Sequence, residues 1–280
     1  MKEIKVSQII EAVEQLCMNA NYDLNGDILE ALKEGVRCEK SSTGRRVLEQ
    51  LVENAEIASA ERMAICQDTG MAVVFIEIGQ DVHITGGSLV DAINEGVRRG
   101  YAKGFLRKSV VSDPLDRKNT GDNTPAVIHF DIKMGDSLKI ILAPKGFGSE
   151  NMSAVRMLKP ADGVDGVRRF IEETVENAGP NPCPPVVVGV GIGGTMEKAA
   201  ILAKKALLRP VSRHNPKEEI KNLETEMLER INRLGIGPAG LGGLLTAMAV
   251  NIEVFPTHIA GLPVAVNMSC HVTRHAEVVL

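Results

Sequence analysis

The spacing of apolar residues changes near residue 70 of this 280-residue chain, and that change constrains the fold more than any other feature. Before it, apolar residues recur at helical spacing and predict helices over residues 6–16, 28–36 and 43–62. The run from Ala72 to Ile78, by contrast, is strand-like and closes at a glycine. Helices followed by strands predict a mixed α+β fold with a helical N-terminal region.

Helical and strand-like segments then continue to the end of the chain, without an internal repeat or a low-complexity linker. Further helices are predicted over residues 88–99, 164–177, 196–207 and 217–234, and strands over residues 82–85, 126–132, 138–142, 186–188 and 263–267. The strand at 82–85 is expected to extend or pair with the one before it. We therefore predict a single large domain over residues 1–280.

The composition excludes several classes of partner. The chain is 44% hydrophobic and 24% charged with a net charge of −4. It therefore has no net positive electrostatic potential that would attract nucleic acid or an anionic membrane. No apolar run approaches the roughly 20 residues that span a bilayer. The first residues lead into a charged amphipathic stretch rather than a signal peptide, so we expect a cytoplasmic protein.

Three of the five cysteines lie in short polar turns: Cys66, Cys183 and Cys270. An odd number of cysteines in a chain of this length does not indicate a disulfide framework. Cys17 and Cys38 lie on or after helical patterns and are expected to be ordinary packing residues. The other three could also be small buried hydrophobic residues. Alternatively, three thiolates can hold three irons of a four-iron cluster and leave the fourth open to substrate.

Polar side chains near these cysteines could serve the same site. Gln67 and Asp68 offer a hydrogen-bond donor and a proton carrier directly beside Cys66. The glycine–serine loop at 145–153 could offer backbone amides to a carboxylate. Arg107 could bind a carboxylate or simply cap a surface, and His258 is a candidate for acid–base work, although a lone histidine is more often structural.

Two further patterns have alternative explanations. The glycine run at 189–194 matches a dinucleotide-binding pattern, but no second strand ending in an acidic residue follows it. Its glycines are expected to let the backbone approach a bulky cofactor or another backbone. His271 and His275 are four residues apart and could chelate a metal if the segment were helical; a solvent-exposed tail is the alternative.

Taken together, these segments resemble the N-terminal half of the iron–sulfur hydro-lyase family that includes class I fumarases and L-tartrate dehydratases. More narrowly, the chain resembles the separate alpha subunit of the two-chain form. The segments that carry the resemblance occur in the expected order and span most of the chain: residues 65–70, 146–153, 183–194 and 258–270.

The resemblance implies a [4Fe–4S] cluster held by one thiolate each from Cys66, Cys183 and Cys270. The open iron would bind a carboxylate and a hydroxyl of a small dicarboxylate substrate. Further substrate contacts are implied at Gln67, Asp68, Arg107, Gly148 and His258. Of these, Asp68 and His258 would be the catalytic residues.

Single-chain members of the family carry a further C-terminal domain that this chain lacks, so the resemblance implies a separate beta subunit. It also implies association between alpha chains. The expected reaction is the reversible hydration of fumarate to malate, with L-tartrate dehydration as the alternative. A non-catalytic, metal-binding regulatory subunit is the alternative from a different class, and a nicotinamide-dependent dehydrogenase is a third, weakened by the missing acidic residue.

Overall fold

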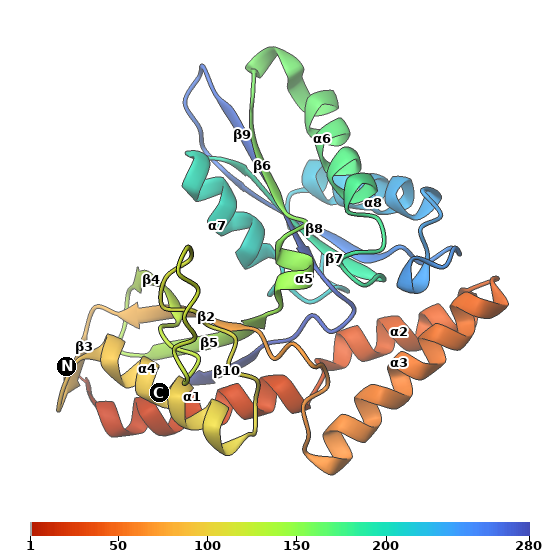
Figure 1. Cartoon of the computed structure of the whole chain (residues 1–280). Coiled ribbons are helices and arrows are strands. Elements are labelled where there is room, and N and C mark those ends of the chain that lie inside the picture. The colour runs from red at the N-terminus through yellow and green to blue at the C-terminus, as the bar shows by residue number, and fades with distance from the viewer. Residues whose placement is uncertain (1) are drawn as a thin grey trace. The chain divides into compact units, whose positions relative to one another are not determined.

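In the computed structural model, which describes residues 2–280, three helices follow the short first strand β1 (Lys2–Lys5) (Figure 1). They are α1 (Val6–Tyr22), α2 (Gly26–Cys38) and α3 (Ser42–Glu61). Strands follow them and alternate with helices to the end of the chain. The α+β class and the helical N-terminal region predicted from the sequence are therefore confirmed.

The chain divides into two compact units, each built from separate stretches of sequence. The first unit comprises residues 2–24, 55–147 and 274–280, and the second comprises residues 25–54 and 148–273. Because α3 begins in the second unit and ends in the first, no linker marks the division in the sequence. The single domain over residues 1–280 stays a prediction.

A four-stranded sheet with the order β10-β5-β2-β4 forms the centre of the first unit. Its strands are β2 (Met71–Gly79), β4 (Val127–Lys133), β5 (Leu138–Lys145) and β10 (Ala276–Val279). β2 pairs in parallel with β4 and antiparallel with β5, and β10 pairs antiparallel with β5. The consecutive strands β4 and β5 are thus separated by β2.

Helices α1 and α4 (Leu89–Lys103) pack together in the core of this unit. The Ser88 hydroxyl caps α4 by accepting a hydrogen bond from the Asp91 N–H, at 3.3 Å. A Cβ added to Gly96 would lie 2.8 Å from the Ile10 carbonyl oxygen, so glycine is needed for the two helices to approach. Cys17 is fully buried where the two helices meet, which confirms it as a packing residue. Its burial, and to a lesser extent the negative charge of Glu14, raises the pKa of its thiol.

The strand predicted at residues 82–85 forms, but it has a different partner. β3 (Val82–Thr85) pairs in parallel with β1 (Lys2–Lys5) in a separate two-stranded sheet. It therefore neither extends nor pairs with β2.

The second unit contains another four-stranded sheet, with the order β6-β9-β7-β8. Its strands are β6 (Ala154–Leu158), β7 (Val186–Gly193), β8 (Ala247–Phe255) and β9 (Leu262–Ser269). β7 pairs in parallel with β8 and antiparallel with β9, which pairs antiparallel with β6. The short helix α5 (Phe147–Glu150) leads into this sheet, and two 3-10 helices lie at Pro160–Asp162 and Pro238–Gly240.

Helices cover both faces of this second sheet. α6 (Gly163–Ala178) and α8 (Glu218–Arg233) share a core with Val188 and Val190 of β7. α7 (Met196–Ala206) lies on the opposite face, towards which the alternate residues of β7 point (Figure 1).

The glycine run explains how α7 reaches the sheet so closely. A Cβ on Gly189 would lie 2.1 Å from the carbonyl oxygen of Ala203, and one on Gly191 would lie 2.0 Å from that of Ala199. Any side chain at these positions would displace the helix. The expectation that the glycines admit another backbone is therefore confirmed.

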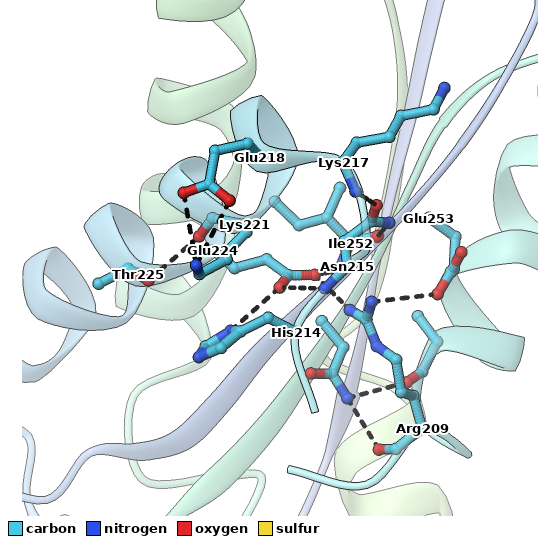
Figure 2. A network of polar contacts seen from close by, with 12 residues as sticks. Arg209, His214, Asn215, Lys217, Glu218, Lys221, Glu224, Thr225, Ile252 and Glu253 are labelled. Atoms are coloured by element: carbon cyan, nitrogen blue, oxygen red, sulfur yellow. Dashed lines mark hydrogen bonds and ion pairs between the residues drawn. The ribbon is translucent and has the colours of Figure 1, made fainter. Parts of the chain in front are cut away.

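A buried ionic network joins α8, β8 and the segment between α7 and α8 (Figure 2). Glu224 is 1% exposed and pairs with Arg209. Its carboxylate also accepts hydrogen bonds from the N–H groups of Ile252 and Asn215, at 2.8 and 3.0 Å. One side chain thus holds together a helix, a strand and the segment that precedes the helix.

None of the helices formed by residues 2–280 combines the length and the apolar character that a membrane span requires.

Candidate active site

Cys66 lies on a turn between α3 and β2 that is fixed mainly through its backbone. Gly70 has a φ of 75°, and a Cβ there would lie 2.7 Å from the backbone nitrogen of Lys145. The buried Tyr101 hydroxyl lies 2.7 Å from the Thr69 carbonyl oxygen and 3.0 Å from that of Gly70, and it donates to this pair. Burial raises the pKa of Tyr101, so the hydroxyl remains protonated as a donor.

Asp68 ties this turn to the start of α5, which follows β5. Its carboxylate accepts hydrogen bonds from the backbone N–H groups of Gly70 and Phe147, at 3.0 and 2.9 Å. The buried Arg274 donates to the Asp68 carbonyl oxygen at 2.8 Å and to the side-chain oxygen of Asn21 at 3.2 Å. Both the side chain and the backbone of Asp68 are therefore held in place by hydrogen bonds.

The other predicted residues of the first unit lie beside the same turn. The Cys66 thiol lies 3.4 Å from the side-chain oxygen of Gln67. The Thr69 hydroxyl donates to the backbone carbonyl of Arg107 at 3.1 Å, and the Arg107 residue is exposed. The structure therefore brings Cys66, Gln67, Asp68 and Arg107 to one corner of the first unit.

The second unit brings the segments of Cys183 and Cys270 together. Cys183 has a φ of 57°, in the left-handed region, and its carbonyl oxygen accepts a hydrogen bond from the backbone N–H of His271 at 3.3 Å. The Nδ1 atom of His271 lies 3.0 Å from the same oxygen. Cys270, the residue before His271, directly follows β9, so the two cysteine-bearing loops meet at the carboxyl end of that strand.

Gly148 belongs to the short helix α5, which is anchored to β9 near Cys270. A Cβ on Gly148 would lie 3.9 Å from the carbonyl oxygen of Asn181, in the loop of Cys183. Asn267 of β9 donates to the Glu150 carboxylate at 2.9 Å and to the Ser153 hydroxyl at 3.0 Å. Gly148, Cys183 and Cys270 are thus brought near one another within this unit.

Lys204 of α7 completes this anchor, and this residue was not predicted from the sequence. Its ammonium group pairs with Glu150, and both side chains are largely shielded from solvent. Together with Ser153 and Asn267, the pair lines a hollow of about 210 Å³. No local pattern marks Lys204, because its partner lies 54 residues earlier in the chain.

His258 lies away from these residues. It is an exposed residue of the connection before β9, where its Nδ1 accepts a hydrogen bond from the Ala260 N–H at 3.2 Å. Cys270 follows the other end of β9, so the strand separates the two residues by roughly 25 Å, at about 3.3 Å per residue. The second unit by itself does not bring His258 to Cys270, and its catalytic role stays a prediction.

Three predictions from the sequence are wrong. Residues 271–275 are not helical, so the four-residue spacing of His271 and His275 does not place them on one face of a helix to chelate a metal ion. The residues after them are not a solvent-exposed tail, because β10 pairs with β5. Cys38 is exposed rather than packed, and its thiol donates a 2.9 Å hydrogen bond to Glu34 that raises its pKa.

The chemistry of the three cysteines fits a cluster. Among residues 2–280, no three His, Cys, Asp or Glu side chains are grouped to hold a metal ion, and Cys66 belongs to a different unit from the other two. Even so, none of the three cysteines is in a disulfide, and all three are at least partly accessible, which suits reactive or metal-binding thiols. Cys17 is unsuitable because it is buried with a raised pKa.

Replacing Asp68 with asparagine should loosen the Cys66 turn. The two N–H groups approach different oxygens of the carboxylate, and asparagine would replace one of these acceptors with an NH2 donor. We therefore expect a loss of about 1–3 kcal/mol in the free energy of unfolding. Urea denaturation measures this loss. The exposed Asp81, replaced by asparagine, is the control and should change stability by less than about 0.5 kcal/mol. Equal stability of the two variants would contradict the structural role of Asp68.

Comparison with known proteins identifies the family. Residues 10–279 match the sequence model of the fumarate hydratase (Fumerase) family. A Methanocaldococcus jannaschii protein, provisionally named L(+)-tartrate dehydratase subunit alpha, is 44% identical over 275 residues, which cover 96% of each chain. The L(+)-tartrate dehydratase subunit alpha of Escherichia coli K12 is 32% identical over 283 residues, covering 100% of this chain and 93% of the relative.

The fold and the polar turns therefore belong to a subunit of a hydro-lyase. The chain is a member of the fumarate hydratase (Fumerase) family and is similar along its whole length to alpha subunits of its two-chain enzymes. The resemblance inferred from the sequence is confirmed.

Proposed function

We propose that this chain is the alpha subunit of a [4Fe–4S] hydro-lyase that removes water from L(+)-tartrate together with a separate beta subunit. The observation that carries the proposal is similarity over the full length to chains named as alpha subunits of L(+)-tartrate dehydratase. These names support the tartrate alternative better than the fumarate reaction expected first. Fumarate hydration is the second candidate, because the matching family is named for it.

Cys66, Cys183 and Cys270 would hold the cluster with one thiolate each. A cluster bound there would supply a Lewis acid that polarises the substrate hydroxyl as a leaving group. Support comes from the donor set itself: three accessible thiols, none of them in a disulfide, on turns that hydrogen bonds to the backbone and the Lys204 anchor hold in place.

The other residues of the chain would bind and orient the substrate. Asp68 is already oriented by two backbone donors, which suits a carboxylate that must exchange a proton at a fixed position. Gln67 and Arg107 flank it and would bind the substrate hydroxyl and a carboxylate, respectively. Gly148 would offer its backbone N–H to a second carboxylate, and His258 would take part in proton transfer.

A partner chain would supply the remaining cationic contacts. The word alpha in the names of both relatives implies a second type of subunit in those enzymes. We propose the same arrangement here, so that the chain alone turns over slowly or not at all. Its family is a family of hydro-lyases, which favours an enzyme component over a non-catalytic regulatory subunit.

The test is a substrate comparison with the anaerobically reconstituted pair of subunits. We expect kcat/KM for the dehydration of L(+)-tartrate to exceed that for L-malate by roughly 100-fold or more, since a site that binds a hydroxyl rejects an analogue lacking it. The product of tartrate dehydration tautomerises to a keto acid, which a coupled reductase detects. A preference for malate and fumarate would overturn the tartrate assignment, and full activity of the chain alone would overturn the need for a partner.

A further inference from the structure

An ion pair of the second unit lies beside the backbone that is proposed to bind a substrate carboxylate. Glu150 ends α5, two residues after Gly148, and pairs with Lys204 of α7. The two side chains are 25% and 20% exposed, so solvent screens their charges only in part. Gly148 itself is exposed and accessible to a ligand. A change in the charge of this pair would therefore act on an anion bound at Gly148.

Asn267 connects the ion pair to the end of β9. Its side-chain oxygen lies 3.5 Å from the Lys204 ammonium group. Its NH2 group donates to the Glu150 carboxylate at 2.9 Å and to the Ser153 hydroxyl at 3.0 Å. Because Asn267 is only 6% exposed, its amide has few other partners to turn to. The amide presents its acceptor to the cation and its donor to the carboxylate, an orientation that the two charges favour together.

The residue before Cys270 has a separate support that uses no charged group. Ser269 is in register with Val187, in the antiparallel pairing of β9 with β7. The backbone ladder therefore holds the end of β9, whereas the ion pair holds the segment of residues 148–153. A change in the ion pair should disturb the binding of an anion at Gly148 and leave Cys270 in place.

We propose that Lys204 is a positioning residue for substrate binding, which holds Glu150 against Asn267 and offsets its negative charge beside the Gly148 N–H. This inference rests on the proposed function, because that function assigns a substrate carboxylate to Gly148. A dicarboxylate anion approaches a segment that carries a carboxylate of its own, and like charges placed side by side reduce affinity. Lys204 counters that repulsion and, through Asn267, fixes the segment that receives the anion.

The experiment measures the dissociation constant of succinate for the anaerobically reconstituted pair of subunits by calorimetry. Succinate carries both carboxylates of the substrate but has no hydroxyl to lose, so it binds without reacting. Lys204→Met should raise this constant by about 10-fold. For L(+)-tartrate the same variant should raise KM and leave kcat within about 3-fold of wild type, as the loss of uniform binding requires.

The sign of the effect separates this role from a merely structural one. Lys204→Met shifts the charge beside Gly148 by one unit towards negative, and Glu150→Gln shifts it by one unit towards positive. Both changes break the ion pair, so a structural role predicts weaker succinate binding in both variants. The proposal predicts weaker binding only in Lys204→Met, and binding at least as tight as in wild type in Glu150→Gln. The double variant restores the net charge and should return to within about 3-fold of wild type.

Lys221→Met is the matched control. Lys221 of α8 also pairs with a glutamate of the second unit, Glu218 at 3.4 Å, but both side chains are exposed. This variant should bind succinate as wild type does. Iron and inorganic sulfide should be retained equally in every variant, because the backbone ladder rather than the ion pair holds the end of β9. Glu150→Gln and its sign test remain decisive if Lys204→Met does not fold.

Three results would overturn the inference while the wild-type pair is active. They are unchanged succinate binding in Lys204→Met, weaker binding in Glu150→Gln, and loss of iron in Lys204→Met, which would mean that the pair supports a cluster ligand instead. A wild-type pair that holds no cluster and dehydrates neither tartrate nor malate would overturn the proposed function, and this inference with it.

Discussion

Cys183→Ser should yield a folded protein that retains almost no iron or inorganic sulfide after anaerobic reconstitution. Removing an outer partner of a metal ligand lowers affinity or activity by about 10–100-fold, so removing a ligand itself should exceed that range. Cys66→Ser and Cys270→Ser should behave alike. Iron and sulfide analysis measures the loss, and electron paramagnetic resonance after mild oxidation should show a three-iron signal in wild type that the variants lack.

The fold should tolerate this change because serine keeps the backbone contacts of Cys183. The Cys183 carbonyl oxygen accepts a hydrogen bond from the His271 N–H, and the sulfur lies 3.9 Å from the Asn181 carbonyl oxygen. Serine keeps the backbone interactions and the left-handed turn that precedes the two prolines. An unchanged circular dichroism spectrum beside the lost iron would separate a ligand from a residue that holds the fold.

Cys38→Ser is the matched control for the cluster. Like Cys183, Cys38 is an exposed cysteine of the second unit that forms no disulfide, but its thiol donates to Glu34, which raises the pKa of the thiol and disfavours the thiolate. The variant should retain iron as wild type does. Equal retention in Cys183→Ser and wild type, or equal loss in Cys38→Ser, would mean that the ligand set is wrong.

The candidate site was predictable where it consists of short segments. The cysteines at 66, 183 and 270 stand in polar turns, and local sequence alone distinguishes them from Cys17 in its apolar helix. The long-range hydrogen bonds that hold these turns in place were not predictable. Arg274 reaches Asp68 across 206 residues of sequence, and no periodic pattern encodes such a contact.

The fold shows the same division between local and distant contacts. Helices such as α1 and α4 follow from apolar spacing and a serine cap, both of which operate within a few residues. The partners of the strands do not follow from spacing: β3 pairs with β1, and β2 lies between β4 and β5. Strand partners depend on which surfaces the whole chain buries, so a single sequence constrains them weakly.

We expect the largest loss in the free energy of unfolding from a substitution in the buried network around Glu224. Glu224→Ala leaves the Arg209 guanidinium and the N–H groups of Ile252 and Asn215 without the carboxylate that they share (Figure 2). Breaking a buried ion pair by removing one partner costs about 3–5 kcal/mol. Glu253 lies 3.5 Å from Arg209 and would still partly balance its positive charge. We therefore expect a loss near the lower end of that range in urea unfolding.

Two comparisons separate this network from an ordinary surface charge. Glu229→Ala lies on the same helix, where the exposed Glu229 pairs with Arg233, and it should cost less than about 1 kcal/mol. Arg209→Met added to Glu224→Ala removes the isolated buried charge and should recover part of the stability, so the two changes should not be additive. If Glu224→Ala costs no more than Glu229→Ala, the network does not stabilise the second unit. If the two changes are additive, Arg209 and Glu224 are not energetically coupled.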